Sequence, residues 1–361
     1  MDAVFVLNCG SSSIKFQLIQ PKSGKVLLKG LAENLNTDRA VLKSSEGTVK
    51  LEKTDYRSAL SAIVKLLSAH SFIAIGHRVV HGGEAFSSSQ IITPEVLETI
   101  KNCNHLAPLH NPINALGIEM MADFFPTIPQ IAVFDTAFHQ TLPETAYLYA
   151  IPYEYYEKHQ VRRYGFHGTS HRFVVQEAAK MIDKPLGKTS FISCHLGNGC
   201  SIAAVAGGKS VDTSMGLTPL EGLVMGERSG DLDPSIISFL SNHLKISADE
   251  VTSILNKKSG LLGISGKSGD MRLLLEANDI RSKIAVEIFC YRLAKYIASY
   301  LVPLGTIDAV LFTGGIGENS AKIRDKVMDL LGPFNLKTLV IPTNEELMIA
   351  QDAATLVRER K

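Results

Sequence analysis

Two distant stretches of the sequence share one layout, and this repetition constrains the fold more than any other feature. VLNCGSSSIKFQLI near the start and SCHLGNGCSIAAVAGG at 193–208 each combine an apolar strand, a turn of small residues and a second strand. Glycine permits a close backbone approach that other residues do not, so both turns are expected to be tight. The repetition predicts two halves of similar topology, each opening with a hairpin whose turn faces the same cleft.

Segments typical of strands and of helices alternate along the rest of the chain. FIAIGHRVV, QIAVFD and DAVLFTGG are apolar runs of strand length, whereas 56–70 and 282–301 space their apolar residues as helices do. Interleaved strands and helices predict the α/β class. No low-complexity linker separates the two halves, so the repetition alone indicates where they divide.

Composition and charge exclude several classes of protein. The chain has 361 residues with 37 basic and 36 acidic side chains, which argues against nucleic-acid or membrane-surface binding. The most apolar late segment, 293–312, is interrupted by Lys295, Pro303 and Asp308, so no membrane span is predicted. The five cysteines form no CxxC pair, which disfavours a disulfide framework or structural zinc. We expect a soluble, cytoplasmic protein.

Three glycine-rich turns follow strands and are candidates for phosphate binding: GSSSIK, GNG at 197–199 and GGIGEN at 314–319. Backbone N–H groups of such turns can reach phosphate oxygens. An ordinary tight turn explains any one of them, but three with polar tips favour a ligand. GSSSIK lacks the second glycine of a Walker A loop, and GNGCSIAA runs into a strand instead of a helix. A nucleotide site here would therefore be of another type.

Charged residues beside these turns suggest an anion site with a metal. Arg78 in IGHRVVHGGE and Arg228 in MGERSGDLDP lie among glycines, and a guanidinium matches carboxylates and phosphates with two hydrogen bonds. A helix end or a surface position explains either arginine equally well. Asp135 ends QIAVFD, and Glu345 follows TLVIPT. A carboxylate at a strand end can hold Mg²⁺, although TNEE also fits a helix N-terminal cap.

Histidines occur in pairs four residues apart, at His77 and His81 and at His167 and His171. HGTSH lacks the glutamate of a zinc-binding HExxH helix, and no third ligand accompanies the other pair. Structural hydrogen bonding, or donation to a phosphate, is therefore favoured over zinc.

The chain resembles the acetate/propionate kinase family from end to end. The resemblance rests on motifs in the family's order: LNCGSSSIKF, GHRVVHGG, APLHNP, VFDTAFH, RRYGFHGTSH, HLGNG, DTSMGLTPLEG, RSGDLDP, FTGGIGEN and IPTNEELMIAQD. It implies two similar actin-like ATPase/sugar-kinase domains around a nucleotide cleft, and a homodimer. Residues 1–137 with 347–361 would form the domain on the acyl-substrate side with the first phosphate turn, and 138–346 the nucleotide-binding domain.

The resemblance also implies roles for individual residues. Catalytic roles fall to Arg78, Asp135, His167 and Arg228. The acyl substrate would contact Arg78, Val80, Leu109, Phe166 and Pro219. The nucleotide would contact Ser11, Ser13, Lys15, His195, Leu196, Gly197, Asn198, Gly199, Asp270, Met271, Arg272, Gly315, Ile316, Gly317, Glu318 and Asn319. Magnesium, with manganese as an alternative, would lie at Asn8 and Glu345.

The reaction implied by the resemblance is reversible, direct in-line transfer of the ATP γ-phosphoryl group to acetate, giving acetyl phosphate and ADP. A carboxylic acid with a pKa of about 4 to 5 is ionised at neutral pH, so the nucleophile needs no strong base. It needs its repulsion from the triphosphate cancelled, which two arginines and Mg²⁺ would do.

Three alternatives accompany this hypothesis. Propionate kinase is the nearest, and the resemblance implies that Val80 favours the shorter acid, because a smaller residue there would favour the longer acyl chain. A non-catalytic actin-like nucleotide-binding protein is disfavoured because every charged position that the chemistry needs is present. A dehydrogenase is disfavoured because no strand–GxGxxG–helix unit occurs.

Two departures from the family pattern stand out. Glu227 precedes Arg228 where the family usually has a small polar residue. In an extended stretch the two side chains would point to opposite faces. The chain is also shorter than its family, and the missing part is predicted between Gly332 and Thr338. We expect a trimmed surface loop with the site intact, although the TNEE turn follows directly.

Overall fold

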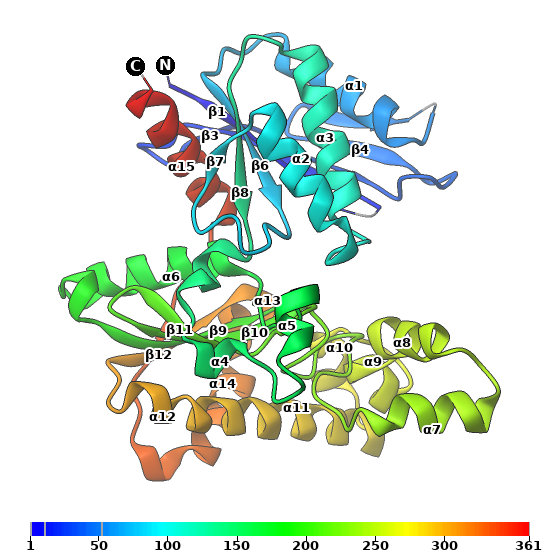
Figure 1. The fold of residues 1–361 in the computed structure, drawn as a ribbon, viewed down its shortest axis with the longest axis vertical. Helices are drawn as coiled ribbons and strands as arrows, with labels where there is room; N and C mark the ends of the chain where they lie inside the picture. Colours follow the sequence, from blue (N-terminus) through cyan, green and yellow to red (C-terminus); the bar gives the residue numbers. More distant parts are fainter. Residues whose placement is uncertain (1, 11, 52, 361) are drawn as a thin grey trace. The chain divides into compact units, whose positions relative to one another are not determined.

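The computed structural model describes residues 2–10, 12–51 and 53–360, and the chain divides into two compact units (Figure 1). Unit 1 comprises Met1–Gln140 and Asn344–Lys361, and unit 2 comprises Thr141–Thr343. The boundaries therefore follow residues 140 and 343, where the sequence suggested 137 and 346. Glu345 accordingly belongs to unit 1.

Unit 1 is built on a sheet with the strand order β5-β4-β3-β2-β1-β6-β8-β7. The strands are β1 (Val4–Cys9), β2 (Ile14–Ile19), β3 (Val26–Glu33), β4 (Val41–Ser44), β5 (Gly47–Lys50), β6 (Ala74–Val79), β7 (Gln90–Ile91) and β8 (Gln130–Phe134). β1 pairs with β2 in an antiparallel hairpin, while β1, β6 and β8 run parallel. The carboxyl ends of these three strands consequently meet at one edge of the sheet.

Helices cover both faces of this sheet: α1 (Tyr56–Leu67), α2 (Pro94–Asn102), α3 (Asn111–Phe124) and α15 (Glu345–Glu359). Alternate residues of a strand point to opposite faces. Phe5 and Leu7 of β1 accordingly pack with α1 and α3, whereas Val4 and Val6 pack against α15. Figure 1 shows α15 on one side of the sheet and α1 and α3 on the other. Burial on both faces explains the unbroken apolar run of β1.

Gly76 of β6 allows α15 to lie close to the sheet. A Cβ atom at Gly76 would stand 2.5 Å from Cγ2 of Ile349, a branched side chain with little rotamer freedom. α15 begins at Glu345, so this close packing brings the acidic start of the helix to the carboxyl edge of the sheet.

Unit 2 repeats the opening hairpin on a second sheet, in the order β11-β10-β9-β12-β13. Its strands are β9 (Ser190–Leu196), β10 (Cys200–Ala206), β11 (Lys209–Thr213), β12 (Ala309–Thr313) and β13 (Thr338–Val340). β9 and β10 form an antiparallel pair around residues 197–199, and β12 runs parallel to β9 and β13. The α/β class and the repeated strand–turn–strand layout are both confirmed.

The helices of unit 2 are α4 (Glu144–Tyr147), α5 (Glu154–His159), α6 (Gly168–Met181), α7 (Ser235–Leu244), α8 (Ala248–Lys257), α9 (Gly260–Ser265), α10 (Met271–Glu276), α11 (Ile280–Ser299), α12 (Leu301–Leu304), α13 (Gly314–Asn319) and α14 (Ala321–Leu330). α11 buries a stripe that includes Ala285, Phe289 and Leu293. A short 3₁₀ turn, Gly332–Phe334, leads from α14 towards β13, where the sequence predicts a trimmed loop.

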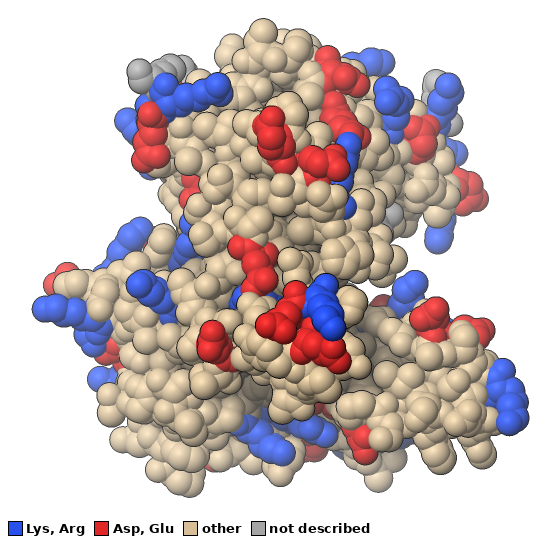
Figure 2. All heavy atoms as spheres, viewed as in Figure 1, with Lys and Arg blue, Asp and Glu red and all other residues tan. Residues whose placement is uncertain are grey.

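The charges on the surface and the apolar character of the helices agree with the near-zero net charge and the ordinary apolar content of the chain. On the face drawn in Figure 2, acidic and basic side chains both occur, as the net charge of +1 leads one to expect. Within the described residues, no helix combines the length and the apolar character needed to cross a membrane.

Candidate active site

The carboxyl edge of the unit 1 sheet assembles an arginine with two carboxylates. Nε of Arg78 donates to Oδ1 of Asp135 at 3.0 Å, and Nη2 donates to Oδ2 at 2.6 Å. Such a two-point ion pair fixes the plane of the guanidinium. Asp135 is 1% exposed, directly after β8. Oε2 of Glu345, at the start of α15, lies 3.8 Å from Nε of Arg78.

The electrostatics of this edge are dominated by acids. Burial acts to lower the pKa of Arg78, but Asp135 and Glu345 outweigh that effect and the pKa rises. Burial raises the pKa of Glu345 to about 7, with Asp135 and Glu346 adding to the rise and Arg78 opposing it. Lys15 forms an ion pair with Glu346. Three carboxylates thus face two cations, and the cluster has negative charge in excess.

The first turn lies at the same edge. Asn8 is half-buried and pairs across the hairpin with Lys15. The preceding residue, Leu7, pairs with His77 in β6, so Asn8 and Arg78 occupy neighbouring strand ends. The carbonyl of Ser13 accepts a hydrogen bond of 2.8 Å from the N–H of Gly10, which closes the turn. Ser11, predicted to contact the nucleotide, lies outside the described residues.

Two asparagines of α3 hold the backbone of this edge. Oδ1 of Asn114 accepts from the N–H of Val80 at 3.1 Å, and its Nδ2 donates to the carbonyl of Cys9 at 2.9 Å. Asn111 makes the equivalent pair of bonds to the N–H and the carbonyl of His81. Both asparagines are buried. α3 therefore fixes the spacing between the carboxyl ends of β1 and β6.

In unit 2, the second glycine turn lies against the other arginine. The N–H of Gly197 donates to the carbonyl of Gly199 at 3.1 Å. A Cβ at Gly199 would stand 2.9 Å from Nη2 of Arg228 and 3.5 Å from Cε1 of His167. Nη1 of Arg228 donates to the carbonyl of Pro219 at 2.7 Å, and burial lowers the pKa of Arg228. The turn, the arginine and the histidine are thus neighbours.

The HGTSH histidines have hydroxyl partners. The hydroxyl of Ser201 lies 2.9 Å from Nδ1 of His167 and 2.8 Å from Nε2 of His171. His167 stacks on His195 with ring centroids 4.3 Å apart, and Nδ1 of His195 lies 2.8 Å from the hydroxyl of Ser170. Among residues that the structure describes, no group of three His, Cys, Asp or Glu side chains could hold a metal.

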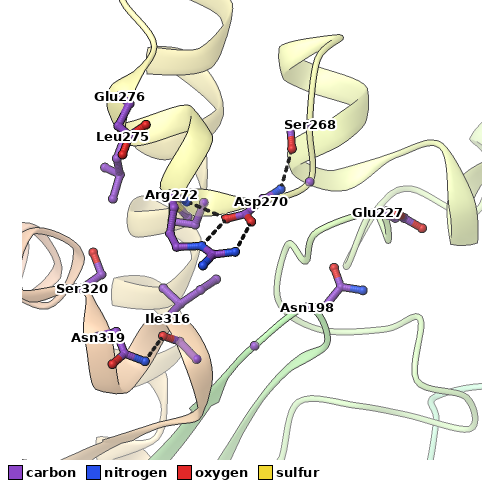
Figure 3. Close-up of a pocket in the computed structure, with 14 residues that line it drawn as sticks. Asn198, Glu227, Ser268, Asp270, Arg272, Leu275, Glu276, Ile316, Asn319 and Ser320 are labelled. Carbon is purple, nitrogen blue, oxygen red and sulfur yellow. Dashed lines mark hydrogen bonds and ion pairs between the residues drawn. The ribbon is translucent and has the colours of Figure 1, made fainter. Parts of the chain in front are cut away.

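A pocket of about 1040 Å³ opens beside this turn within unit 2 (Figure 3). Its lining comprises Gly197, Asn198, Glu227, Ser268, Gly269, Asp270, Met271, Arg272, Leu275, Glu276, Gly315, Ile316, Asn319 and Ser320. Arg272 and Asp270 form a two-point ion pair of 3.1 and 2.6 Å, and the Asn319 side chain donates to the carbonyl of Gly315 at 2.9 Å. The pocket therefore joins the second and third glycine turns.

Comparison with known proteins identifies the family. Residues 3–339 match the model of the acetokinase family. The chain belongs to the acetokinase family.

Individual members are similar over almost their whole length. The acetate kinase of Shewanella frigidimarina is 50% identical, with 98% of each chain covered. That of Thermoanaerobacterium thermosaccharolyticum is 48% identical, with 99% of this chain and 100% of the relative covered.

Solved structures of the family are also similar. The crystal structure of a propionate kinase from Francisella tularensis has a TM-score of 0.94 at 47% identity, covering 98% of this chain and 100% of that one. The Porphyromonas gingivalis acetate kinase has a TM-score of 0.92 at 41% identity, covering 99% and 100%.

The structure separates the residues predicted for this acetokinase-family site into several groups. The pocket brings together Gly197, Asn198, Asp270, Met271, Arg272, Gly315, Ile316 and Asn319. Leu196 and Gly317 are buried and do not line it. Glu318 accepts hydrogen bonds from the N–H groups of Gly314 at 2.9 Å and Thr343 at 3.2 Å. Its carboxylate thereby connects the third turn to the segment after β13.

The residues predicted for acyl contacts differ in exposure. Val80 and Phe166 are buried at 8% and 2%, and Pro219 is half-buried. Leu109 is 58% exposed in unit 1. Side chains that line a preformed apolar pocket are normally covered. The exposure of Leu109 therefore differs from what its predicted contact with the acyl group leads one to expect.

Sequence reasoning missed several residues that line the pocket: Ser268, Leu275, Glu276 and Ser320. Leu275 and Glu276 follow Met271 and Arg272 by four positions, which places each pair on one side of α10. That spacing could have predicted that Leu275 and Glu276 lie beside the pocket.

Glu227 borders the pocket while the adjacent Arg228 approaches Gly199. Residues 226–227 form a bend instead of an extended stretch.

Asn114 provides a test of how this edge is held. We expect Asn114→Ala to destabilise the protein by about 2–4 kcal/mol, because it leaves a buried N–H and a buried carbonyl without partners. Thermal and urea unfolding followed by circular dichroism would measure the loss. The exposed Asn102→Ala is the matched control and should change stability by less than about 0.5 kcal/mol. Equal stability of the two variants would contradict the structural role of Asn114.

Proposed function

We propose that this member of the acetokinase family transfers the γ-phosphoryl group of ATP reversibly to acetate, giving acetyl phosphate and ADP. The chain is a phosphotransferase whose acceptor is a carboxyl group. The observation that supports this proposal most strongly is that the chain is 48–50% identical to acetate kinases along nearly the full length of both chains. The structural likeness to a propionate kinase makes that reaction the second candidate.

ATP is proposed to bind in the pocket of unit 2. At one side, Asn198 would offer its backbone N–H to the phosphates, as tight glycine turns do, while the N–H of the neighbouring Gly197 closes the turn onto Gly199. Met271 and Ile316 both line the same pocket and would make the apolar contacts with the base. His195, Leu196, Gly199, Gly317 and Glu318 would support these contacts. We also propose that Ser11, Ser13 and Lys15 of the first turn contact the phosphates.

The two arginines are proposed to cancel the repulsion between acetate and the triphosphate. Acetate is ionised at neutral pH, with a pKa of about 4 to 5, so direct in-line attack needs no general base. Among the described residues, the carbonyl of Pro219 is the one hydrogen-bond partner of the Arg228 guanidinium, so its other N–H groups are available to an anion. Asp135 holds Arg78 in plane. His167, beside Gly199, would donate to the phosphoryl group.

Residues suited to magnesium lie at the edge of unit 1. Mg²⁺ takes oxygen ligands and retains several waters. Glu345 offers a carboxylate whose pKa is raised to about 7 by burial and by its acidic neighbours, which marks a place where a cation is favoured. Asn8 at the neighbouring strand end would supply an amide oxygen. Bound there, the ion would neutralise charge on the triphosphate; Mn²⁺ is an alternative.

A homodimer and a cytoplasmic location complete the proposal. All five cysteines are buried free thiols, as suits a reducing compartment. Large apolar side chains are exposed on α7 and α11: Ile236, Phe239, Leu244, Ile280, Ile284 and Tyr291. Exposed apolar groups of this kind favour an interface. Light scattering during gel filtration should give about twice the chain mass of 39.2 kDa; a mass of one chain at micromolar concentration would refute the dimer.

Removal of either arginine tests the proposed charge cancellation. Arg78→Ala and Arg228→Ala should each lower kcat by roughly 10³-fold or more in protein that circular dichroism shows to be folded, because each removes a cation from the transferring phosphoryl group. Arg39→Ala, at an exposed position, serves as the control with normal turnover. A folded variant with near-normal turnover would remove that arginine from the mechanism.

An acyl-hydroxamate assay with ATP and Mg²⁺ tests the reaction itself. Acetate, propionate and butyrate are supplied in separate reactions. We expect the rate to be highest with acetate and to fall with chain length, because Val80 limits the space for the acyl chain. Preference for propionate would keep the phosphoryl transfer and overturn the role of Val80. Absence of any acyl phosphate would refute the proposed function.

A further inference from the structure

A loop without regular secondary structure carries the one hydrogen-bond acceptor that the described residues offer to Arg228. Residues 214–222 lead away from the end of β11 at Thr213, and Pro219 lies within them. The carbonyl of Pro219 accepts the 2.7 Å bond from Nη1 of Arg228. The direction of the guanidinium therefore depends on where this loop is held.

Glu221 lies at the centre of the contacts that hold the loop. Its Oε1 accepts a hydrogen bond of 2.5 Å from Nη2 of Arg163, and its Oε2 accepts one from the hydroxyl of Tyr149. The Tyr149 oxygen in turn accepts from the N–H of Leu217 at 2.8 Å. We call Tyr149, Arg163 and Glu221 the Glu221 cluster. It connects the middle of the loop to the segment that precedes α6.

The same cluster also holds the beginning of the loop. Nη1 of Arg163 donates to the carbonyls of Thr213 at 2.8 Å and Ser214 at 2.9 Å. One guanidinium thus joins the start of the loop to Glu221 near its end. Arg163 and Glu221 are only 17% and 29% exposed, so their ion pair is less screened by water than a surface pair.

Packing at Gly216 shows how closely the loop follows the cluster. A Cβ at Gly216 would stand 1.7 Å from Oε2 of Glu221 and 2.2 Å from the hydroxyl oxygen of Tyr149. The backbone can run here only because residue 216 has no side chain. Burial raises the pKa of Tyr149, so its hydroxyl keeps the proton that it donates.

The loop has a second attachment, whose hydrogen bonds involve no residue of the cluster. The N–H of Gly222 donates to Oδ1 of Asp231 at 2.7 Å, and Asp231 also accepts from the hydroxyl of Tyr296. Loss of one contact in the Glu221 cluster therefore leaves the end of the loop anchored. Such a change is expected to shift the loop without unfolding unit 2.

We propose that Glu221, held by Tyr149 and Arg163, is a positioning residue that sets the place of the Pro219 carbonyl and thereby the orientation of Arg228. The inference rests on the proposed function, in which Arg228 binds the acetate or the transferring phosphoryl group. Among the described residues, the cluster makes no hydrogen bond or ion pair with a side chain that lines the pocket, so it acts on Arg228 through the loop. Interactions that orient a catalytic charge influence the transition state more than they influence nucleotide binding.

The experiment compares Tyr149→Phe and Glu221→Gln with the wild-type enzyme. Each change removes a hydrogen bond or a charge with little change in volume. We expect kcat/KM for acetate to fall about 10- to 100-fold, and KM for ATP to change less than about twofold, because the nucleotide pocket is formed by other elements. Thermal unfolding is recorded for every variant.

Two controls separate positioning from general stability. Tyr155→Phe removes a hydroxyl from an exposed tyrosine and should leave all constants unchanged. Asp308→Asn weakens the 2.7 Å ion pair to Lys184, which lies at the amino ends of β9 and β12, away from the loop. It should lower the unfolding temperature without changing kcat/KM for acetate. If the Glu221 cluster variants behave like Asp308→Asn, the cluster is merely structural and the proposal is overturned.

A second readout does not depend on turnover. Phenylglyoxal modifies accessible arginines, and peptide mass spectrometry reports the rate at Arg228 alone. We expect Glu221→Gln to raise that rate several-fold and Asp308→Asn to leave it unchanged. If the wild-type enzyme forms no acyl phosphate, the proposed function fails while this rate still tests the positioning of Arg228. Equal rates in wild type and Glu221→Gln would overturn the inference.

Discussion

The ion pair between Arg78 and Asp135 is the interaction on which the edge of unit 1 depends. A charge taken out of water must be paired, or it costs several kcal/mol. Asp135 is almost fully buried and holds the guanidinium with two bonds. Glu345 then joins a cluster that already contains a paired acid, which is why burial and its neighbours raise its pKa. Carboxylates outnumber cationic side chains in this cluster, which suits the magnesium ion that we propose for this edge.

The two arginines are held in different ways, and the difference matters for their chemistry. Arg78 is bound by a carboxylate, which compensates its charge, whereas Arg228 is bound by the neutral carbonyl of Pro219. A carbonyl directs a guanidinium without cancelling its charge. Among the described residues no carboxylate forms an ion pair with Arg228, although Glu227 lies beside it and favours its charge. The position of Arg228 then depends on the loop that carries Pro219, and the Glu221 cluster holds that loop in place.

Several features of the site were predictable because they are local. A strand followed by small residues predicts a tight turn wherever it occurs, and HLGNG and GGIGEN both form parts of one pocket. Asn114 was not predicted, because its partners at Cys9 and Val80 come from strands far away in the sequence. Glu318 lies within a predicted motif, yet its carboxylate binds backbone N–H groups of unit 2. Motif membership does not determine where a side chain points.

The sequence by itself determined the class of the fold and the repeated hairpin, since apolar spacing and turn residues act within a few positions of each other. The family was predicted from the resemblance of its short motifs to those of known members. A helix start at TNEE was predictable, but only the tertiary structure decided that this helix packs on the unit 1 sheet, with Ile349 lying against Gly76. It alone showed that Arg163, Tyr149 and Glu221 meet around the loop that holds Arg228. These contacts join residues distant in the chain, and burial in a shared core is what brings them together.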